Sequence, residues 1–356
     1  MKKCGVRILD AIGGTVQIQA ESRHCWTVIQ RYDGENQDNN QNPTWLAVEN
    51  AGSEVRVRLQ VQWATSEWMP YRKFGYLKCG TQWDVIKGEV DATTTTYEFS
   101  APTGVINFAV LPWYSNEDAD RFFKKVCRQS PLCQVQTIGH SREGRAIRAL
   151  TVGRQKSGSK NVLIVGREHA GETPASFMIE AIVKYLLSGK ASEKWLRTFV
   201  FHILPIANPD GVANGTKNPQ LGPDRASDGS NLYYAGMTSA DPTCQVVRDY
   251  KIGLRPACFL NYHSFLFPIP QIIFYDKKKG MRALDFLLGE PNPKDCADWM
   301  ARRQREAGHS LDTYLWKRFR TQSVCFEVPW AGHSVKEIEA LGVKTLVSIL
   351  AAESAG

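Results

Sequence analysis

The stretch NVLIVGREHAGETPASFMIEAIVKYL, residues 161–186, decides the fold. It begins with a short apolar run that ends at Gly166 and is typical of a buried strand, and it continues into a helical pattern with an apolar stripe. A strand that leads directly into a helix predicts an α/β domain, in which ligands collect at the carboxyl ends of the strands. His169 and Glu172 lie at this junction.

The sequence pattern changes near Trp113. Before about residue 110, period-two and β-branched runs such as VRVRLQVQW (55–63) and GVINFAVLPW (104–113) predict strands. From SNEDADRFFKKVCRQ (115–129) onward, helical patterns alternate with short apolar strands. We therefore predict an all-β, sandwich-like domain over residues 1–112 and an α/β domain over residues 113–356, with a mixed, largely parallel sheet flanked by helices.

Composition excludes several classes of protein. The chain has 356 residues, of which 43% are hydrophobic and 22% charged, so it is neither disordered nor fibrous. Its start is too polar for a signal peptide, and no apolar run is long enough to span a membrane. The sequence thus predicts a soluble protein in the cytoplasm, or in the periplasm or outside the cell if a signal peptide has been removed. The oligomeric state stays open.

Charge and cysteine usage add two further expectations. The 44 basic residues are interspersed with 36 acidic ones, which argues against a nucleic-acid groove but leaves acidic substrates possible. The nine cysteines include no C-x-x-C pair, and most stand singly in apolar surroundings. We therefore predict reduced thiols and no disulfide framework.

The spacing of His169 and Glu172 suggests a metal site, although an acid at a helix start equally complements the helix dipole. In a first helical turn, residues three apart lie on one side. Catalytic zinc takes three protein ligands, often two His and one Glu, and keeps a fourth position for water. His263 supplies the third, because it lies near the end of a second apolar strand, ACFLNYHSF (257–265). We predict one zinc ion per chain, bound by His169, Glu172 and His263.

Glu327 is the candidate general base. It is the single acid in the apolar strand SVCFEVPW (323–330), and burying a carboxylate there is costly unless it has a partner or a function. Hydrolysis by a zinc-activated water needs a carboxylate that accepts the proton of the water and passes it to the leaving amine. A nearby Arg or Lys would instead make Glu327 a structural acid.

Five segments in this order resemble the signatures of the zinc metallocarboxypeptidase family: TIGHSREGRAIRALTVG (137–153), GREHAGETP (166–174), LPIANPDGVANG (204–215), NYHS (261–264) and CFEVPW (325–330). The resemblance covers nearly the whole chain. It is greatest to the cytosolic carboxypeptidase branch, in which a β-domain precedes the catalytic domain and the zinc motif reads His-Pro-Gly-Glu. It implies zinc ligation by His169, Glu172 and His263, with Glu327 as general base and proton shuttle.

The family pattern also bears on other residues. Arg167 and the turn from Glu143 to Arg145 fit it and look more structural than catalytic, although Arg167 is kept as a substrate-contact candidate. Asn208, Pro209 and Asp210 resemble a turn that shapes one wall of the site, and they equally fit a plain Asx/Pro turn.

One departure from the family concerns the substrate carboxylate. Family members carry an Asn-Arg pair that binds the terminal carboxylate of the peptide, whereas this chain has Tyr233 and Tyr234 at the corresponding positions. Tyr234 offers neither the charge nor the two-pronged geometry of arginine. Candidate replacements are Arg225 and Lys217 in the preceding loop and Lys317 ahead of Glu327, and each equally fits a solvated charge.

Three functions follow from these residues. The first is a metallocarboxypeptidase that releases a C-terminal residue, possibly acidic, from a peptide or peptide-like substrate. The second is an amidase or deacylase on the same scaffold. The third is a non-catalytic zinc- or ligand-binding protein, which would not need Glu327. A serine hydrolase is set aside, because GHSREG (139–144) has the spacing G-x-S-x-x-G in place of G-x-S-x-G.

Overall fold

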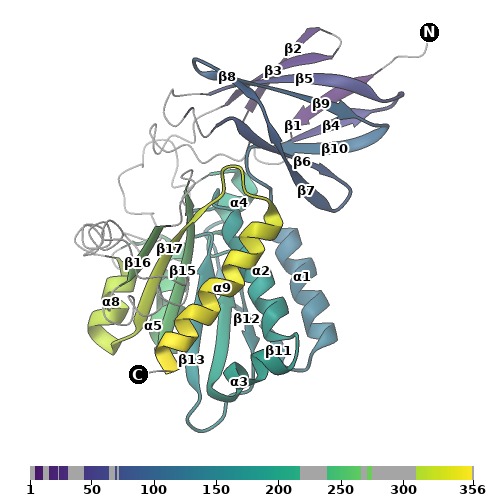
Figure 1. Ribbon diagram of the computed structural model, residues 1–356. Helices are drawn as coiled ribbons and strands as arrows, with labels where there is room; N and C mark the ends of the chain where they lie inside the picture. Colours follow the sequence, from purple (N-terminus) through teal and green to yellow (C-terminus); the bar gives the residue numbers. More distant parts are fainter. Residues whose placement is uncertain are drawn as a thin grey trace, which may run out of the picture.

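The computed structural model describes residues 5–10, 16–22, 24–30, 44–63, 69, 72–216, 239–265, 271–274 and 310–354. A strand-rich part packs on one end of a sheet that is flanked by helices (Figure 1). Within the described residues, none of the helices is both long and apolar enough to cross a membrane.

The N-terminal part is a sandwich of two five-stranded sheets. One sheet has the order β1-β4-β10-β6-β7, with strands Val6–Asp10, Leu46–Asn50, Gly104–Ala109, Phe74–Cys79 and Gln82–Lys87. The other has the order β2-β3-β5-β9-β8, with strands Val16–Ser22, Cys25–Gln30, Val55–Gln62, Thr94–Ala101 and Glu89–Asp91. Side chains alternate between buried and exposed along β4 and β9, so the apolar residues of both sheets form a shared core.

The second part is built on a mixed seven-stranded sheet of order β11-β12-β14-β13-β15-β17-β16. Its strands are Cys133–His140, Ala146–Val152, Phe199–Leu204, Lys160–Gly166, Cys258–Phe265, Gln322–Pro329 and Gln271–Phe274 in that order. The four central strands β14, β13, β15 and β17 run parallel, and the outer pairings are antiparallel.

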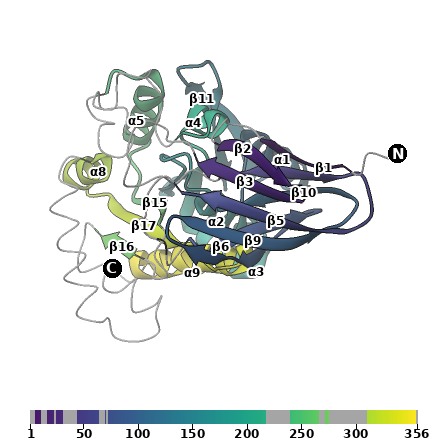
Figure 2. The ribbon, with the colours of Figure 1, turned by 90° about the horizontal axis from the view of Figure 1, so that it is seen from above.

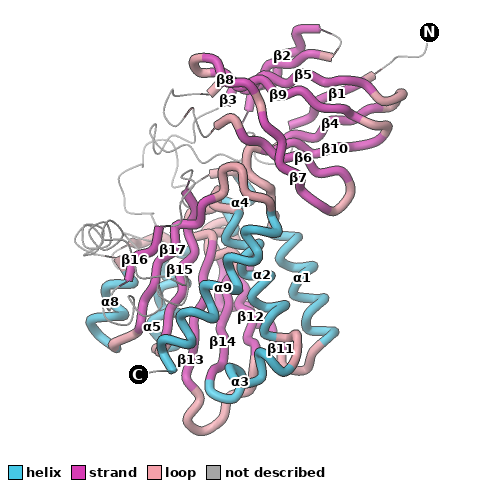
Figure 3. Tube along the Cα trace, viewed as in Figure 1, coloured by secondary structure: helices cyan, strands magenta, loops and turns pink. Residues whose placement is uncertain are grey.

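Helices cover both faces of this sheet (Figure 3). The described helices are α1 (Asn116–Gln129), α2 (Pro174–Leu186), α3 (Lys190–Thr198), α4 (Pro209–Asn214), α5 (Pro242–Leu254), α8 (Leu311–Phe319) and α9 (Val335–Ser354). Residues of α1, α2 and α9 share one core cluster with Val162 and Ile164 of β13, whereas α5 and α8 pack with Leu163 and Val165 on the other face. The predicted fold class is therefore confirmed for both parts of the chain.

The sandwich packs on the segment that follows β17 (Figure 2). The hydroxyl group of Tyr76, which is fully buried on β6, donates to the carbonyl oxygen of Trp330 or of His333, at 2.5 and 2.9 Å. Gly332 adopts φ +81°, and an added Cβ there would lie 2.9 Å from the ring of Phe74. The sandwich therefore holds the chain only a few residues beyond Glu327. The boundary at residues 112/113, which falls between β10 and α1, stays a prediction.

Replacing Tyr76 by phenylalanine is expected to lower the free energy of unfolding by about 1–3 kcal/mol, because the buried carbonyl oxygen of Trp330 and the partly buried one of His333 lose the hydroxyl donor that they share. Urea unfolding measures the change. Tyr250→Phe is the matched control, since the hydroxyl of Tyr250 is partly exposed and makes only long contacts of 3.4 and 3.5 Å. Equal, small losses in the two variants would contradict a stabilising role for the Tyr76 contact.

Candidate metal centre

The turn after β13 carries the first two candidate ligands. Arg167 follows the last residue of β13, Gly166, and has a positive φ of 59°. The chain then closes a tight turn in which the amide of Glu172 donates to the carbonyl oxygen of His169 at 3.1 Å. Thr173 is the N-cap of α2 and Pro174 its first residue. Glu172 therefore precedes the helix, and the prediction that it lies in the first helical turn is wrong. The physical reason is that proline is favoured at the first helical position, where its missing N–H costs nothing.

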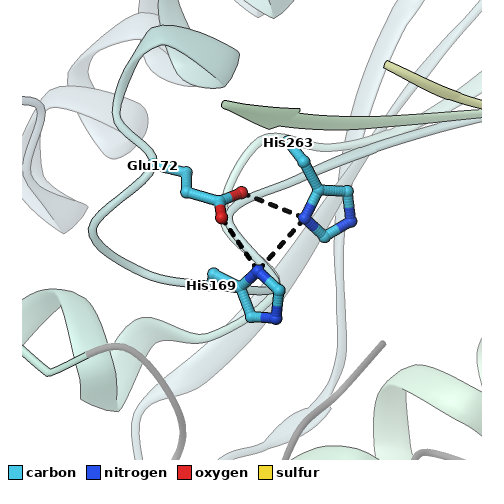
Figure 4. Close-up of side chains that lie close together, drawn as sticks. All are labelled: His169, Glu172 and His263. Atoms are coloured by element: carbon cyan, nitrogen blue, oxygen red, sulfur yellow. Dashed lines mark hydrogen bonds and ion pairs between the residues drawn. The ribbon is translucent and has the colours of Figure 1, made fainter. Parts of the chain in front are cut away.

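His169, Glu172 and His263 converge on one point (Figure 4). The Nδ1 atom of His169 lies 2.9 Å from Glu172 Oε1, the Nδ1 atom of His263 lies 3.0 Å from Glu172 Oε2, and the two Nδ1 atoms are 3.2 Å apart. All three side chains are buried. Among the residues that the structure describes, this is the only group of three or more His, Cys, Asp or Glu side chains whose ligand atoms all lie within 4.8 Å of one another.

These distances fit a zinc ion. Zinc–nitrogen and zinc–oxygen bonds of about 2.0–2.1 Å in a tetrahedral arrangement place neighbouring ligand atoms about 3.3 Å apart. The observed separations of 2.9–3.2 Å are close to this value. Two imidazole nitrogens and a carboxylate are also a ligand set that zinc prefers at catalytic sites. The donor atoms of this trio therefore match zinc in both type and spacing.

Electrostatics favour a charged Glu172. Burial alone would raise the pKa of its carboxyl group, but the charges and hydrogen bonds of His169 and His263 outweigh burial and hold the pKa below its usual range. The backbone amide of Ser264 also donates to Glu172 Oε2, at 3.1 Å. Glu172 is thus held ionised, as a metal ligand must be.

Glu327 lies beside the trio on the neighbouring strand. His263 of β15 and Glu327 of β17 are register partners in the parallel pairing, so their side chains leave the sheet on the same side. Glu327 is half-buried, and its charge contributes to a raised pKa of His263, for which burial acts in the opposite direction and Glu172 is the largest partner.

The turn that starts α4 packs against the ligand turn, which is the turn from Arg167 to Thr173 that carries His169 and Glu172. Asn208 caps α4 by accepting from the amide of Gly211 at 2.9 Å, and a Cβ added at Gly211 would lie 2.7 Å from the Cβ of Ala170. Asp210 accepts hydrogen bonds from Ser141, at 2.6 Å, and from Arg145, at 2.8 Å. The NPDG stretch (208–211) therefore lies against the candidate metal centre and ties it to the β11–β12 turn.

Two predicted substrate-contact residues lie elsewhere. Arg167 is fully buried, and its guanidinium donates to the carbonyl oxygens of Ala170 and Tyr114 at 2.5 and 3.0 Å. Burial lowers its pKa to about 9. Lys317 is exposed near the end of α8, before β17 begins, whereas Glu327 lies near the carboxyl end of β17. Arg167 thus stabilises the backbone of the ligand turn, and Lys317 lies at the opposite end of the strand from the site, so neither is kept as a substrate contact.

Other candidates lie outside the described residues, namely Lys217, Arg225, Tyr233 and Tyr234.

The structure also shows a buried polar cluster that could not be seen in the sequence: Glu168, Lys251, Asn261 and Asp312. The one signal in the sequence was an acid directly before a candidate ligand, Glu168 before His169. Among the described cysteines, Cys244, Cys258 and Cys325 are buried, and the reduced state of the thiols stays a prediction.

Comparisons with known proteins point to one family. The model for the family described as zinc carboxypeptidase matches residues 120–243, a segment that includes His169 and Glu172. Cytosolic carboxypeptidase 2 of Xenopus tropicalis is 30% identical over 132 residues, which are 34% of this chain and 14% of that protein. The chain thus matches only a small part of the length of this relative.

Two solved structures share the fold over nearly the whole chain. A metallo-carboxypeptidase from Burkholderia cenocepacia has a TM-score of 0.80 and 19% identity, with 99% of this chain and 100% of that chain covered. A metallo-carboxypeptidase from Pseudomonas aeruginosa, in complex with (2-guanidinoethylmercapto)succinic acid, has a TM-score of 0.75 and 16% identity, with 97% and 98% covered. Residues 120–243 thus match the zinc carboxypeptidase family, and nearly the whole chain shares the fold of metallo-carboxypeptidases.

Proposed function

We propose that this chain is a zinc-dependent hydrolase that cleaves a peptide or peptide-like amide bond, and that it acts as a metallocarboxypeptidase. The observation that carries the proposal is the convergence of two imidazole Nδ1 atoms and one carboxylate within 3.2 Å of one another, beside a half-buried glutamate on the next strand. The match of residues 120–243 to the zinc carboxypeptidase family supports the same reading. We assign one zinc ion per chain to His169, Glu172 and His263.

The residues of the chain divide the chemistry between them. A zinc ion in this site supplies a Lewis acid that makes water nucleophilic at neutral pH and polarises the amide carbonyl. The two histidines and Glu172 would hold the ion as its three protein ligands. Glu327 accepts the proton of the attacking water and donates it to the nitrogen of the leaving amine. This role separates an enzyme from a zinc-binding scaffold, which would gain nothing from a half-buried acid beside its ligands.

Recognition of the substrate carboxylate is the open part of the proposal. Arg225 is the nearest cation in sequence to Tyr233 and Tyr234, and we propose it as the anchor, with Lys217 as the second choice and Tyr234 as an added hydrogen-bond donor. The Pseudomonas aeruginosa neighbour was solved with a succinic acid derivative, which supports a scaffold that accepts carboxylates. The positive net charge of +8 supports an acidic substrate residue.

Replacing Arg225 by alanine is expected to cut kcat/KM on free-acid peptides by about 10- to 100-fold, since a charged hydrogen bond to a carboxylate contributes about 1.5–3 kcal/mol. The same peptides with amidated C-termini should barely respond. Lys217→Ala, which removes the second-choice cation, is measured beside it. A strong acid preference that survives Arg225→Ala and falls in Lys217→Ala would identify Lys217 as the anchor.

An amidase or deacylase is the second candidate, favoured by the tyrosines at the usual anchor positions. Parent enzyme that cleaves the acid and amide forms of one peptide at similar rates would establish it. For the place of action we propose the cytoplasm, because the matched relative is named a cytosolic carboxypeptidase.

A further inference from the structure

Glu168 is a buried carboxylate that the proposed reaction does not use. It stands between Arg167 and His169 at the end of β13, and 1% of it is exposed. Its Oε1 accepts a hydrogen bond from Lys251 Nζ at 2.5 Å, and its Oε2 accepts one from Asn261 Nδ2 at 2.7 Å. Lys251 of α5 and Asn261 of β15 are themselves fully buried. Such a cluster is costly to desolvate, so its retention calls for a reason beyond filling space.

The contact of Glu168 with a candidate zinc ligand gives that reason. His263 directs Nδ1 toward His169 and Glu172, and its other ring nitrogen, Nε2, lies 3.3 Å from Glu168 Oε2. Asn261 precedes His263 by two residues on the same strand, so both side chains leave β15 on one side and meet the same carboxylate oxygen. The carboxylate thus faces the far side of the imidazole from the metal centre.

We propose that Glu168 is a positioning residue for zinc, acting through His263. Its negative charge, 3.3 Å from Nε2, keeps the proton on that nitrogen, leaves the Nδ1 lone pair directed at the metal, and fixes the plane of the ring. Lys251 and Asn261 hold the carboxylate ionised and in place. This inference rests on the proposed function, since it assumes zinc at His169, Glu172 and His263.

Glu168→Gln tests this positioning role, because it removes the negative charge while the size and shape of the side chain stay nearly the same. In the variant, Lys251 Nζ still requires an acceptor and takes the amide oxygen, so the amide NH₂ group must face His263 Nε2 and Asn261 Nδ2, which are both donors. Zinc affinity, measured by competition with a chromophoric chelator, is expected to fall by about 10- to 100-fold. The visible spectrum of the cobalt-substituted protein should also change, because it reports ligand geometry.

Asp241→Asn is the matched control. Asp241 is another buried carboxylate in the same domain, where it caps α5 and pairs with Arg142, and it is not part of the ligand trio. This variant should lower the melting temperature of the metal-free protein while zinc affinity and the cobalt spectrum stay at parent values. If Glu168→Gln does not fold, the double variant Glu168→Gln/Lys251→Met removes the carboxylate and its cation together and should show the same loss of zinc affinity.

The outcomes separate this inference from the proposed function. The positioning role alone is overturned if the parent protein binds zinc and a folded Glu168→Gln or double variant behaves like it. Such a variant would bind zinc with an affinity within threefold of the parent and show an unchanged cobalt spectrum. Parent protein that binds no zinc overturns the proposed function and the positioning role together. A selective loss of affinity in the Glu168 variants, with Asp241→Asn unaffected, supports the inference.

Discussion

Replacing Glu327 by glutamine is expected to leave zinc bound and to reduce kcat by about 10²- to 10⁴-fold. The amide keeps the size of the side chain but cannot accept the proton of the attacking water. Glu327 lies in register with His263 and is not one of the three metal ligands, so the zinc content should not change. Steady-state kinetics on a peptide substrate, paired with metal analysis, measures both quantities in one preparation.

Glu337→Gln is the control for this acid-to-amide change, since Glu337 is an exposed capping residue at the start of α9. Its kcat should equal that of the parent. A substrate analogue should also bind Glu327→Gln and the parent with similar affinity. Parent-level turnover by Glu327→Gln would make Glu327 a structural acid and would favour a zinc-binding protein without catalysis.

Replacing His263 or His169 by alanine is expected to abolish stoichiometric zinc binding, because each change leaves two of the three protein ligands that catalytic zinc uses. The Nδ1 atom of each histidine lies within 3.2 Å of both other ligands, so the two variants should lose zinc alike. Elemental analysis after dialysis against metal-free buffer gives the zinc content, and turnover should disappear with the metal.

His202→Ala is the matched control for the histidine variants. His202 is a partly buried histidine of β14, where it contacts Asn161 and Tyr250 and is not part of the trio. It should keep the zinc content of the parent. Full zinc content in His169→Ala and His263→Ala would disprove the assigned site.

The strand ends were the most predictable part of the site. Because β13, β15 and β17 are buried on both faces, they read in the sequence as apolar runs, and a polar residue at the end of such a run is conspicuous. His263 and Glu327 were found in this way. The first residue of α2 could not be predicted in the same way. It depends on the turn between His169 and Glu172 and on the proline at position 174.

The buried cluster around Glu168 was not predictable, because its members come from β13, α5, β15 and α8 and meet only through tertiary packing. Lys251 in a helix and Asp312 at a helix start look like ordinary surface charges in the sequence. In the structure, burial raises the pKa of Asp312 to about 6, and its Oδ2 lies 3.5 Å from Asn261 Nδ2. For Lys317 the sequence suggested a contact that the fold does not make. Lys317 is close to Glu327 in sequence, but most of the length of β17 separates the two residues in space.

The register pairing of His263 with Glu327 has a consequence for how the protein loses activity under mild denaturing conditions. The two residues sit on adjacent interior strands about 4.8 Å apart, and β17 is paired on both sides, so their separation changes only when the sheet itself opens. Amide protons on such strands exchange mainly through global unfolding of the domain, with an opening free energy close to that of the whole fold. The spacing of His263 and Glu327 is therefore expected to survive local openings elsewhere in the domain and to be lost only when the domain itself unfolds.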